Sequence, residues 1–194
     1  MNIKAAILGA TLAQVPVGAS AESYGKYEVP PYVVEARFSQ IELRAYAPHI
    51  QAEVTVRGAE RAALNQGFRV LAGYIFGGNT SQAGIDMTAP VGQTGEDGLW
   101  TVTFTMPREW TLETLPVPDN EAIRLREVAA HKEVVHTFSG RATVETIAAA
   151  EQILREEAQK QGLETIGALR TYYYDDPMTL PWKRRNEVAL MVAR

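Results

Sequence analysis

The feature that most constrains the fold of this chain is a change in the period of its apolar residues. Between residues 99 and 106, Trp100, Val102 and Phe104 alternate with three threonines. Successive side chains of a strand point to opposite faces, so this alternation predicts a strand with one apolar and one polar face. Pro107 follows and is expected to end the strand, because proline has no backbone N–H to donate.

A helical period replaces the alternation between residues 59 and 76. The apolar positions recur at i, i+4, i+7 and i+11, on one face of a helix: Leu64, Phe68, Leu71 and Ile75. Gly77-Gly78-Asn79 is expected to end this helix, because glycine and asparagine tolerate the left-handed cap conformation. The segment is therefore predicted to be an amphipathic helix that packs its apolar stripe on a sheet.

The same order of elements occurs twice along the chain. A second helix is predicted over Val144–Gln161, with Thr143 as its N-cap. The predicted strands are Tyr32–Phe38, Ile41–Tyr46, Ile50–Val56, Ile85–Gln93, Leu99–Met106, Ala122–Val128, Lys132–Phe138, Leu169–Tyr174 and Asn186–Ala193. Each half has strands, one helix and two more strands. These halves predict an α+β fold, in which one antiparallel barrel, closed or nearly closed, carries both helices outside.

The N-terminal segment has the form of a secretory signal peptide. Lys4 precedes the apolar run Ala5–Ala13, Pro16 follows, and Ala19-Ser20-Ala21 has the small residues that a signal peptidase accepts. Residues 1–21 are therefore predicted to be removed, which leaves 22–194 as one domain in the periplasm or outside the cell. An ordinary alanine-rich helix is the alternative. No later stretch is apolar for long enough to span a membrane.

Composition excludes several classes of function. The chain has no cysteine, which rules out disulfides, thiolate metal sites and a cofactor attached through cysteine. Its net charge is −4, so it lacks the overall positive charge typical of proteins that bind nucleic acid. None of the common catalytic motifs occurs, including G-x-S-x-G, H-E-x-x-H and the P-loop. The chain is therefore expected not to be an enzyme.

Four stretches of the sequence carry a family resemblance, namely Gly67–Asn79, Ile85–Val91, Phe104–Pro107 and Arg184–Val188. In this order and spacing, they resemble the SOUL haem-binding protein family. The likeness covers about residues 27–194. It implies a distorted antiparallel β-barrel built from two pseudo-symmetric halves and flanked by two α-helices.

The resemblance also implies the non-covalent binding of haem or a related tetrapyrrole, as a carrier, buffer or scavenger. The pocket is expected to be apolar and to lie beside the first helix. The residues expected to line it are Leu64, Phe68, Leu71, Ala72, Ile75, Met87, His49 and Tyr174. Burial of several hundred Å² of a macrocycle at about 25 cal/mol/Å² contributes on the order of 10 kcal/mol before ordering costs, so an iron ligand is not required for tight binding.

Polar positions of the family are changed in this chain. A proposed axial histidine of one branch falls at Ala45, and two proposed propionate-binding lysines fall at Gly73 and at or near Thr179. His49 or His136 could ligate haem iron instead, although a turn histidine and a strand histidine are also typical structural residues. Arg69, Lys183, Arg184 and Arg185 are the cations that could replace the lysines.

Two other functions are compatible with the same architecture. The arrangement of two halves is similar to bacterial effector-binding domains, so the chain could bind another flat or amphipathic small molecule. A protein–protein interaction module is the third possibility, and it requires an exposed apolar patch rather than an enclosed pocket.

Overall fold

The alternating segment forms strand β7 (Leu99–Thr105), and its two faces have different neighbours. Val102 and Phe104 pack into a hydrophobic core shared with helix α1 (Glu60–Ile75), whereas Thr101 and Thr103 line a pocket. This computed structural model describes residues 23–193, so the predicted signal peptide (residues 1–21) lies outside the described residues. The predicted alternation is confirmed.

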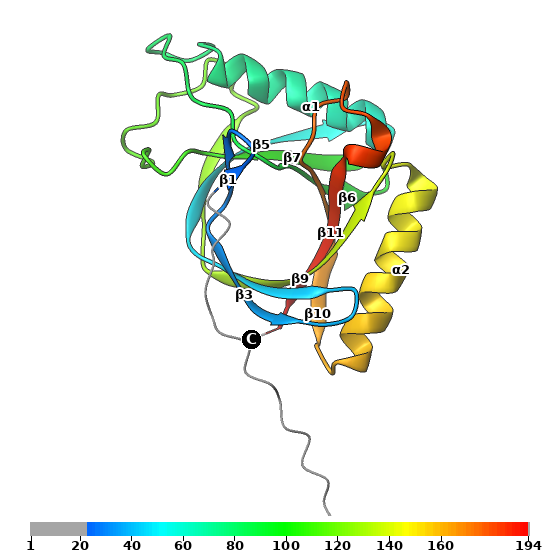
Figure 1. The fold of residues 1–194 in the computed structure, drawn as a ribbon. Helices are drawn as coiled ribbons and strands as arrows, with labels where there is room; N and C mark the ends of the chain where they lie inside the picture. Colours follow the sequence, from blue (N-terminus) through cyan, green and yellow to red (C-terminus); the bar gives the residue numbers. More distant parts are fainter. Residues whose placement is uncertain (1–22, 194) are drawn as a thin grey trace, which may run out of the picture.

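Nine antiparallel strands form one curled sheet, in the order β3-β4-β9-β11-β10-β6-β7-β5-β8 (Figure 1). Besides β7, the strands are β3 (Tyr32–Arg37), β4 (Glu42–Tyr46), β5 (His49–Arg57), β6 (Val91–Glu96), β8 (Arg124–Val128), β9 (His131–Ser139), β10 (Thr165–Tyr173) and β11 (Arg185–Val192). The sheet bends round until its ends approach, but the strand order ends at β3 and β8 without pairing them. The barrel is therefore distorted and open along one seam.

The strand order confirms the two predicted halves. Strands β8-β5-β7-β6 run from one end of the sheet to its middle, and β4-β9-β11-β10 repeat that arrangement from the other end. The pairing register supports the same equivalence between the halves. His49 at the start of β5 pairs with Val128 at the end of β8, and His131 at the start of β9 pairs with Tyr46 at the end of β4. Strand β3 is an addition at the edge of the second set.

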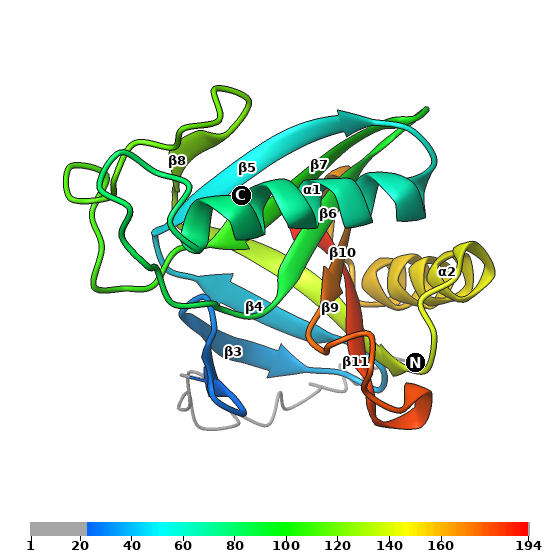
Figure 2. The same cartoon turned by 90° about the horizontal axis from the view of Figure 1, so that it is seen from above.

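Both helices lie outside the barrel (Figures 1 and 2). Helix α1 packs on β5 and β7, and α2 (Val144–Lys160) packs on β9, β10 and β11. The predicted stripe of α1 is largely confirmed, since Leu64, Leu71 and Ile75 are at most 8% exposed. Short elements complete the fold, namely the hairpin β1 (Ser23–Tyr24) with β2 (Tyr27–Glu28) and the 3₁₀ turn η1 (Pro181–Lys183).

One predicted strand begins later than its sequence indicated. The prediction was Ile85–Gln93, but β6 starts only at Val91. The preceding backbone donates elsewhere, because the N–H of Ile85 bonds to the carbonyl of Ile75 and that of Ala89 to the carbonyl of Glu28. Ile85, Met87 and Ala89 are apolar because they cover the core, not because they lie in the sheet.

Two glycines of α1 are expected to respond in opposite ways to the same substitution. A Cβ at Gly67 would lie 2.5 Å from Cγ2 of the buried Val102, whereas a Cβ at Gly73 meets no atom within 4 Å. Gly73→Ala should stabilise the protein by up to about 1 kcal/mol through helix propensity. Gly67→Ala should instead destabilise it by about 1 kcal/mol, because overpacking outweighs the same gain. Urea denaturation of both variants measures the difference, and equal shifts would contradict the close packing.

Candidate functional site

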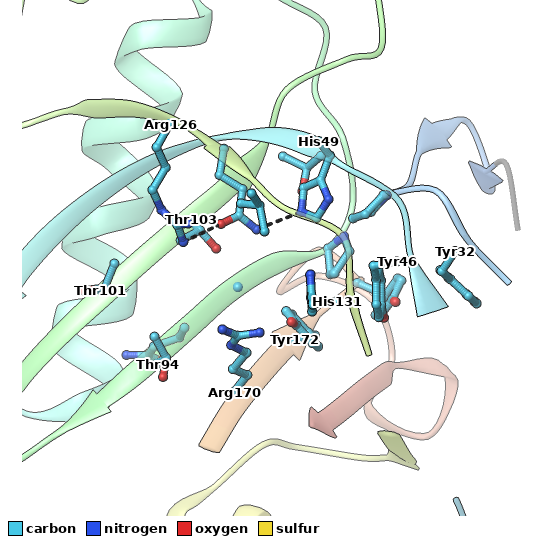
Figure 3. A pocket seen from close by; sticks show the side chains of 18 residues that line it. Tyr32, Tyr46, His49, Thr94, Thr101, Thr103, Arg126, His131, Arg170 and Tyr172 are labelled. Carbon is cyan, nitrogen blue, oxygen red and sulfur yellow. Dashed lines mark hydrogen bonds between the residues drawn. The ribbon is translucent and has the colours of Figure 1, made fainter. Parts of the chain in front are cut away.

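The interior of the barrel contains a pocket formed by residues from eight of the nine strands and their connections (Figure 3). Its wall is mainly polar and aromatic: four tyrosines, two histidines, two arginines, two glutamines and four threonines. Within residues 23–193, no carboxylate lines it. The polar threonine face of β7 is therefore the inner face of the barrel.

The interior pocket is small. Its cavity volume is about 70 Å³. An engineered protein cavity that takes up benzene measures about 150 Å³. The space therefore suits water or one small polar group, and it does not hold a macrocycle.

A buried carboxylate, Glu187, organises one end of the interior. Arg44 binds it in a bidentate pair with two N–O distances of 2.9 Å, and Tyr174 donates its hydroxyl at 2.9 Å. Burial alone would raise the pKa of Glu187, but the guanidiniums of Arg44 and Arg185 outweigh it and hold the pKa below its ordinary value. The carboxylate is thus charged and fully partnered.

A second buried carboxylate, Glu133, lies under the histidine side of the pocket. It forms an ion pair with Arg170, accepts the hydroxyl of Tyr172 at 3.1 Å, and lies 3.4 Å from Nε2 of His131. Burial would raise the pKa of Glu133, but hydrogen bonding to His131 and the charge of Arg170 lower it. Both acids of the interior therefore carry structural ion pairs and are not free bases.

His49 and His131 occupy equivalent positions in the two halves. The Nδ1 atom of each lies 2.9 Å from a carbonyl oxygen two residues upstream, at Ala47 and Ala129, and the two rings are 6.0 Å apart. The local geometry of the turn before β5 is thus repeated before β9. This repetition could be recognised from Ala-x-His, which occurs at both places in the sequence.

A chain of hydrogen bonds fixes the orientation of His49 (Figure 3). Arg126 donates to Oε1 of Gln51 at 3.1 Å, and Nε2 of Gln51 lies 3.4 Å from Nε2 of His49. With Nδ1 bonded to the Ala47 carbonyl, this chain assigns the proton to Nδ1. Burial lowers the pKa of His49, which favours the same neutral ring.

A groove at the mouth of the barrel adjoins the interior pocket, because His49 and Thr105 line both. Its volume is about 400 Å³, and its apolar wall is formed by Pro31, Pro48, Ile50, Met106, Pro107, Trp110 and Leu112. The indole Nε1 of Trp110 is buried and has no hydrogen-bond partner in the described part of the chain. Buried donors without a partner are rare in folded proteins.

A cleft on the outer side of the barrel lies between the N-terminal ends of the two helices. Its volume is about 550 Å³. Arg61, Arg141 and Arg184 line it, together with Tyr173, and none of these guanidiniums forms an ion pair among residues 23–193. Ala142, Val144 and Ile147 supply an apolar wall. The cleft therefore combines free positive charge with apolar surface.

The eight residues expected to line a single pocket do not gather in one place. His49 and Tyr174 line the interior pocket. Leu64, Leu71, Ile75 and Met87 belong to the core between α1 and the sheet, on the opposite face. Phe68 is 40% exposed on α1 and packs edge-on against Phe104, and Ala72 is half-buried on the same helix. The space beside this stripe is occupied by core side chains.

The two candidate iron ligands also lie apart. His136 does not line the interior pocket with His49, and its Nδ1 lies 2.7 Å from the carbonyl oxygen of Gln40. Across residues 23–193, no group of three or more histidine, aspartate or glutamate side chains is placed to hold a metal ion. No helix in this range combines the length and apolarity needed to cross a membrane.

Sequence reasoning missed most of the interior pocket. Arg126 and Arg170 line it, but nothing in their local sequence separates them from surface residues. One signal was available, namely the threonines at 101, 103 and 105, whose regular alternation marks a polar face on a strand with few charges. That signal predicts the face and not what the face encloses.

Comparison with solved structures shows the same fold in distant proteins. A hydrolase from Listeria innocua is 15% identical and aligns with a TM-score of 0.57 over 81% of this chain and 94% of that chain. The C-terminal domain of EcmrR is 13% identical and aligns with a TM-score of 0.63 over 81% and 99%. At these identities the likeness concerns the fold alone.

Comparison with characterised protein sequences finds no match. A family model described as "SOUL heme-binding protein" matches residues 27–191. This range contains both helices and all nine strands of the curled sheet, apart from the last residue of β11. Because this match covers nearly the whole chain, the protein belongs to the SOUL heme-binding protein family.

Proposed function

We propose that this protein binds haem or a related tetrapyrrole non-covalently, as a carrier, buffer or scavenger, and that it is not a catalyst. The observation that carries the proposal is the family match over residues 27–191. The interior acids are tied up in ion pairs, which also favours binding over catalysis. The export signal predicted in residues 1–21 supports a periplasmic or secreted location.

Size favours a site outside the barrel. Pockets for drug-sized ligands measure about 300–1,000 Å³. The interior pocket, at about 70 Å³, is well below this range, whereas the mouth groove and the helix cleft, at about 400 and 550 Å³, fall within it. A macrocycle therefore has two candidate positions.

Charge favours the helix cleft over the mouth groove. Haem carries two propionates, so its site should offer a surplus of cations. The cleft has three arginines against Glu60 and Glu145, while the groove has one arginine against three glutamates. The positive ends of two helix dipoles add to the preference, because both helices begin at the cleft.

We infer that the macrocycle lies at the N-terminal end of α1 and not along the stripe Leu64–Ile75. Val144 is 67% exposed at the rim, and Ile147 and Tyr173 offer further surface to a flat ligand. Arg184 is already oriented, since it donates to the carbonyls of Thr179 and Pro177 at 2.8 and 2.6 Å. The expected site remains beside the first helix, but its charge comes from Arg61, Arg141 and Arg184.

An absorbance titration of the purified protein with haemin tests the proposal. Binding should shift the Soret band and saturate at micromolar haemin. Iron-free protoporphyrin should bind with similar affinity, because packing and propionate contacts and not an axial bond supply the free energy. A spectrum without change at micromolar haemin would remove the proposed function.

His49→Ala is expected to change haemin affinity by less than about tenfold, that is, by less than 1.4 kcal/mol. The reason is its position, since His49 lines the interior and the mouth groove, whereas the cleft lies on the other face of the sheet. The same titration measures the effect. Complete loss of binding in this variant would indicate that haem binds at the mouth of the barrel and not in the helix cleft.

A further inference from the structure

The interior pocket and the mouth groove adjoin each other and differ in the residues that line them. They share His49 and Thr105, so a ligand that reaches from one into the other would pass these two side chains. The inner part is small and lined mainly by polar and aromatic residues, whereas the outer part is larger and has one apolar side, which includes Met106 and Trp110. A site of this form suits a molecule with a small polar head and an apolar body.

The inner part offers Arg126 to an anionic head. Arg126 and Arg170 line it, and no glutamate or aspartate of residues 23–193 does, but Arg170 is already paired with the buried Glu133 beneath the wall. Arg126 uses Nε for Glu53 and Nη2 for Gln51, which leaves further N–H donors on the guanidinium. The Gln51 amide donates one N–H to Nε2 of His49 across a long contact of 3.4 Å, and its second N–H can donate to a bound head group.

The outer part orients the ligand. Glu113 and Glu127 line the groove, and they repel an anion from this end while the interior attracts it. The Trp110 indole adds a large apolar surface and a buried N–H that lacks a partner within the described residues. A carboxylate is thus favoured inside, with its apolar body against Trp110 and the prolines.

We propose that the barrel mouth is a second ligand site, which takes an amphipathic monocarboxylate with its head in the interior pocket and its apolar chain in the groove. This goes beyond the tetrapyrrole function, because the helix cleft lies on the opposite face of the sheet. The head is held by Arg126, Gln51 and the hydroxyl of Thr103, and the chain covers Met106 and Trp110.

Calorimetric titration of the full chain with octanoate and with octan-1-ol tests the proposal. Octanoate should bind, and the alcohol should bind at least about tenfold more weakly because it lacks the charge. Arg126→Gln should weaken octanoate by about tenfold. Arg124→Gln is the matched control, since it removes the same charge from the same strand outside the pocket, and it should leave octanoate affinity unchanged.

Two further variants keep the test decisive if Arg126→Gln does not fold. Thr103→Val retains the shape of the side chain and should weaken octanoate, while Trp110→Phe should weaken both octanoate and octan-1-ol. Equal affinity for acid and alcohol in the unaltered protein, or equal losses in Arg126→Gln and Arg124→Gln, would overturn the proposal.

Haemin separates this site from the proposed function. Haemin affinity should be unchanged in Arg126→Gln and in the presence of saturating octanoate. If octanoate displaced haemin, the interior pocket would hold a propionate of the tetrapyrrole, and the proposal of a separate site would be wrong. If haemin failed to bind while octanoate bound, only the proposed tetrapyrrole function would be wrong.

Discussion

Replacing Arg44 with methionine is expected to lower the free energy of unfolding by about 3 kcal/mol. Arg44 and Glu187 are 1% and 0% exposed, and their bidentate contact links β4 to β11 across the intervening β9. Without Arg44, the charge of the buried Glu187 carboxylate loses its main partner. The loss in free energy of unfolding is then larger than the net contribution of the intact pair. Urea denaturation followed by circular dichroism measures the loss.

Arg37→Met is the matched control for this effect. Arg37 also pairs with a glutamate at 2.9 Å, but its side chain is 61% exposed. An exposed pair contributes at most about 1 kcal/mol. If Arg44→Met cost no more than Arg37→Met, the buried pair would not stabilise the contact between β4 and β11.

The double charge reversal Arg61→Glu with Arg141→Glu is expected to weaken haemin binding by at least about thirtyfold, equivalent to about 2 kcal/mol. Both residues line the helix cleft, and reversal converts attraction for the propionates into repulsion. Each unit charge near the protein surface contributes on the order of 0.5–1 kcal/mol to such an interaction. Soret titration measures the change, and added salt should reduce it.

Arg37→Glu with Arg124→Glu controls for net charge. It alters the charge of the protein by the same amount at positions that do not line the cleft. Its haemin affinity should stay within about threefold of the unaltered protein, or 0.7 kcal/mol. Equal losses in the two double variants would mean that overall charge, and not the cleft, controls binding.

The elements of this fold could be predicted because each has its own period. The alternation around Val102 and the helical spacing of Leu64, Leu71 and Ile75 depend only on neighbouring residues. The exception was Ile85–Ala89, where apolar residues cover the core without joining the sheet. A short apolar run does not by itself distinguish a strand from a loop that packs inward.

The candidate site could not be predicted in the same way. Arg44 and Glu187 are 143 positions apart, and only strand pairing brings them together. The apolar stripe of α1 was expected to border a ligand, but in the folded chain its buried positions pack on the sheet. An apolar face indicates burial, and it does not say whether a side chain or a ligand covers it.

The sequence by itself determined the family, the two repeated halves, the helices and the alternating faces of the strands, because local periodicity and ordered motifs are read along the chain. Tertiary structure decided which face became hollow. Curvature of the nine strands turned Thr101 and Thr103 inward and filled the α1 side with side chains. That outcome depends on pairing between distant strands, so no local pattern contains it.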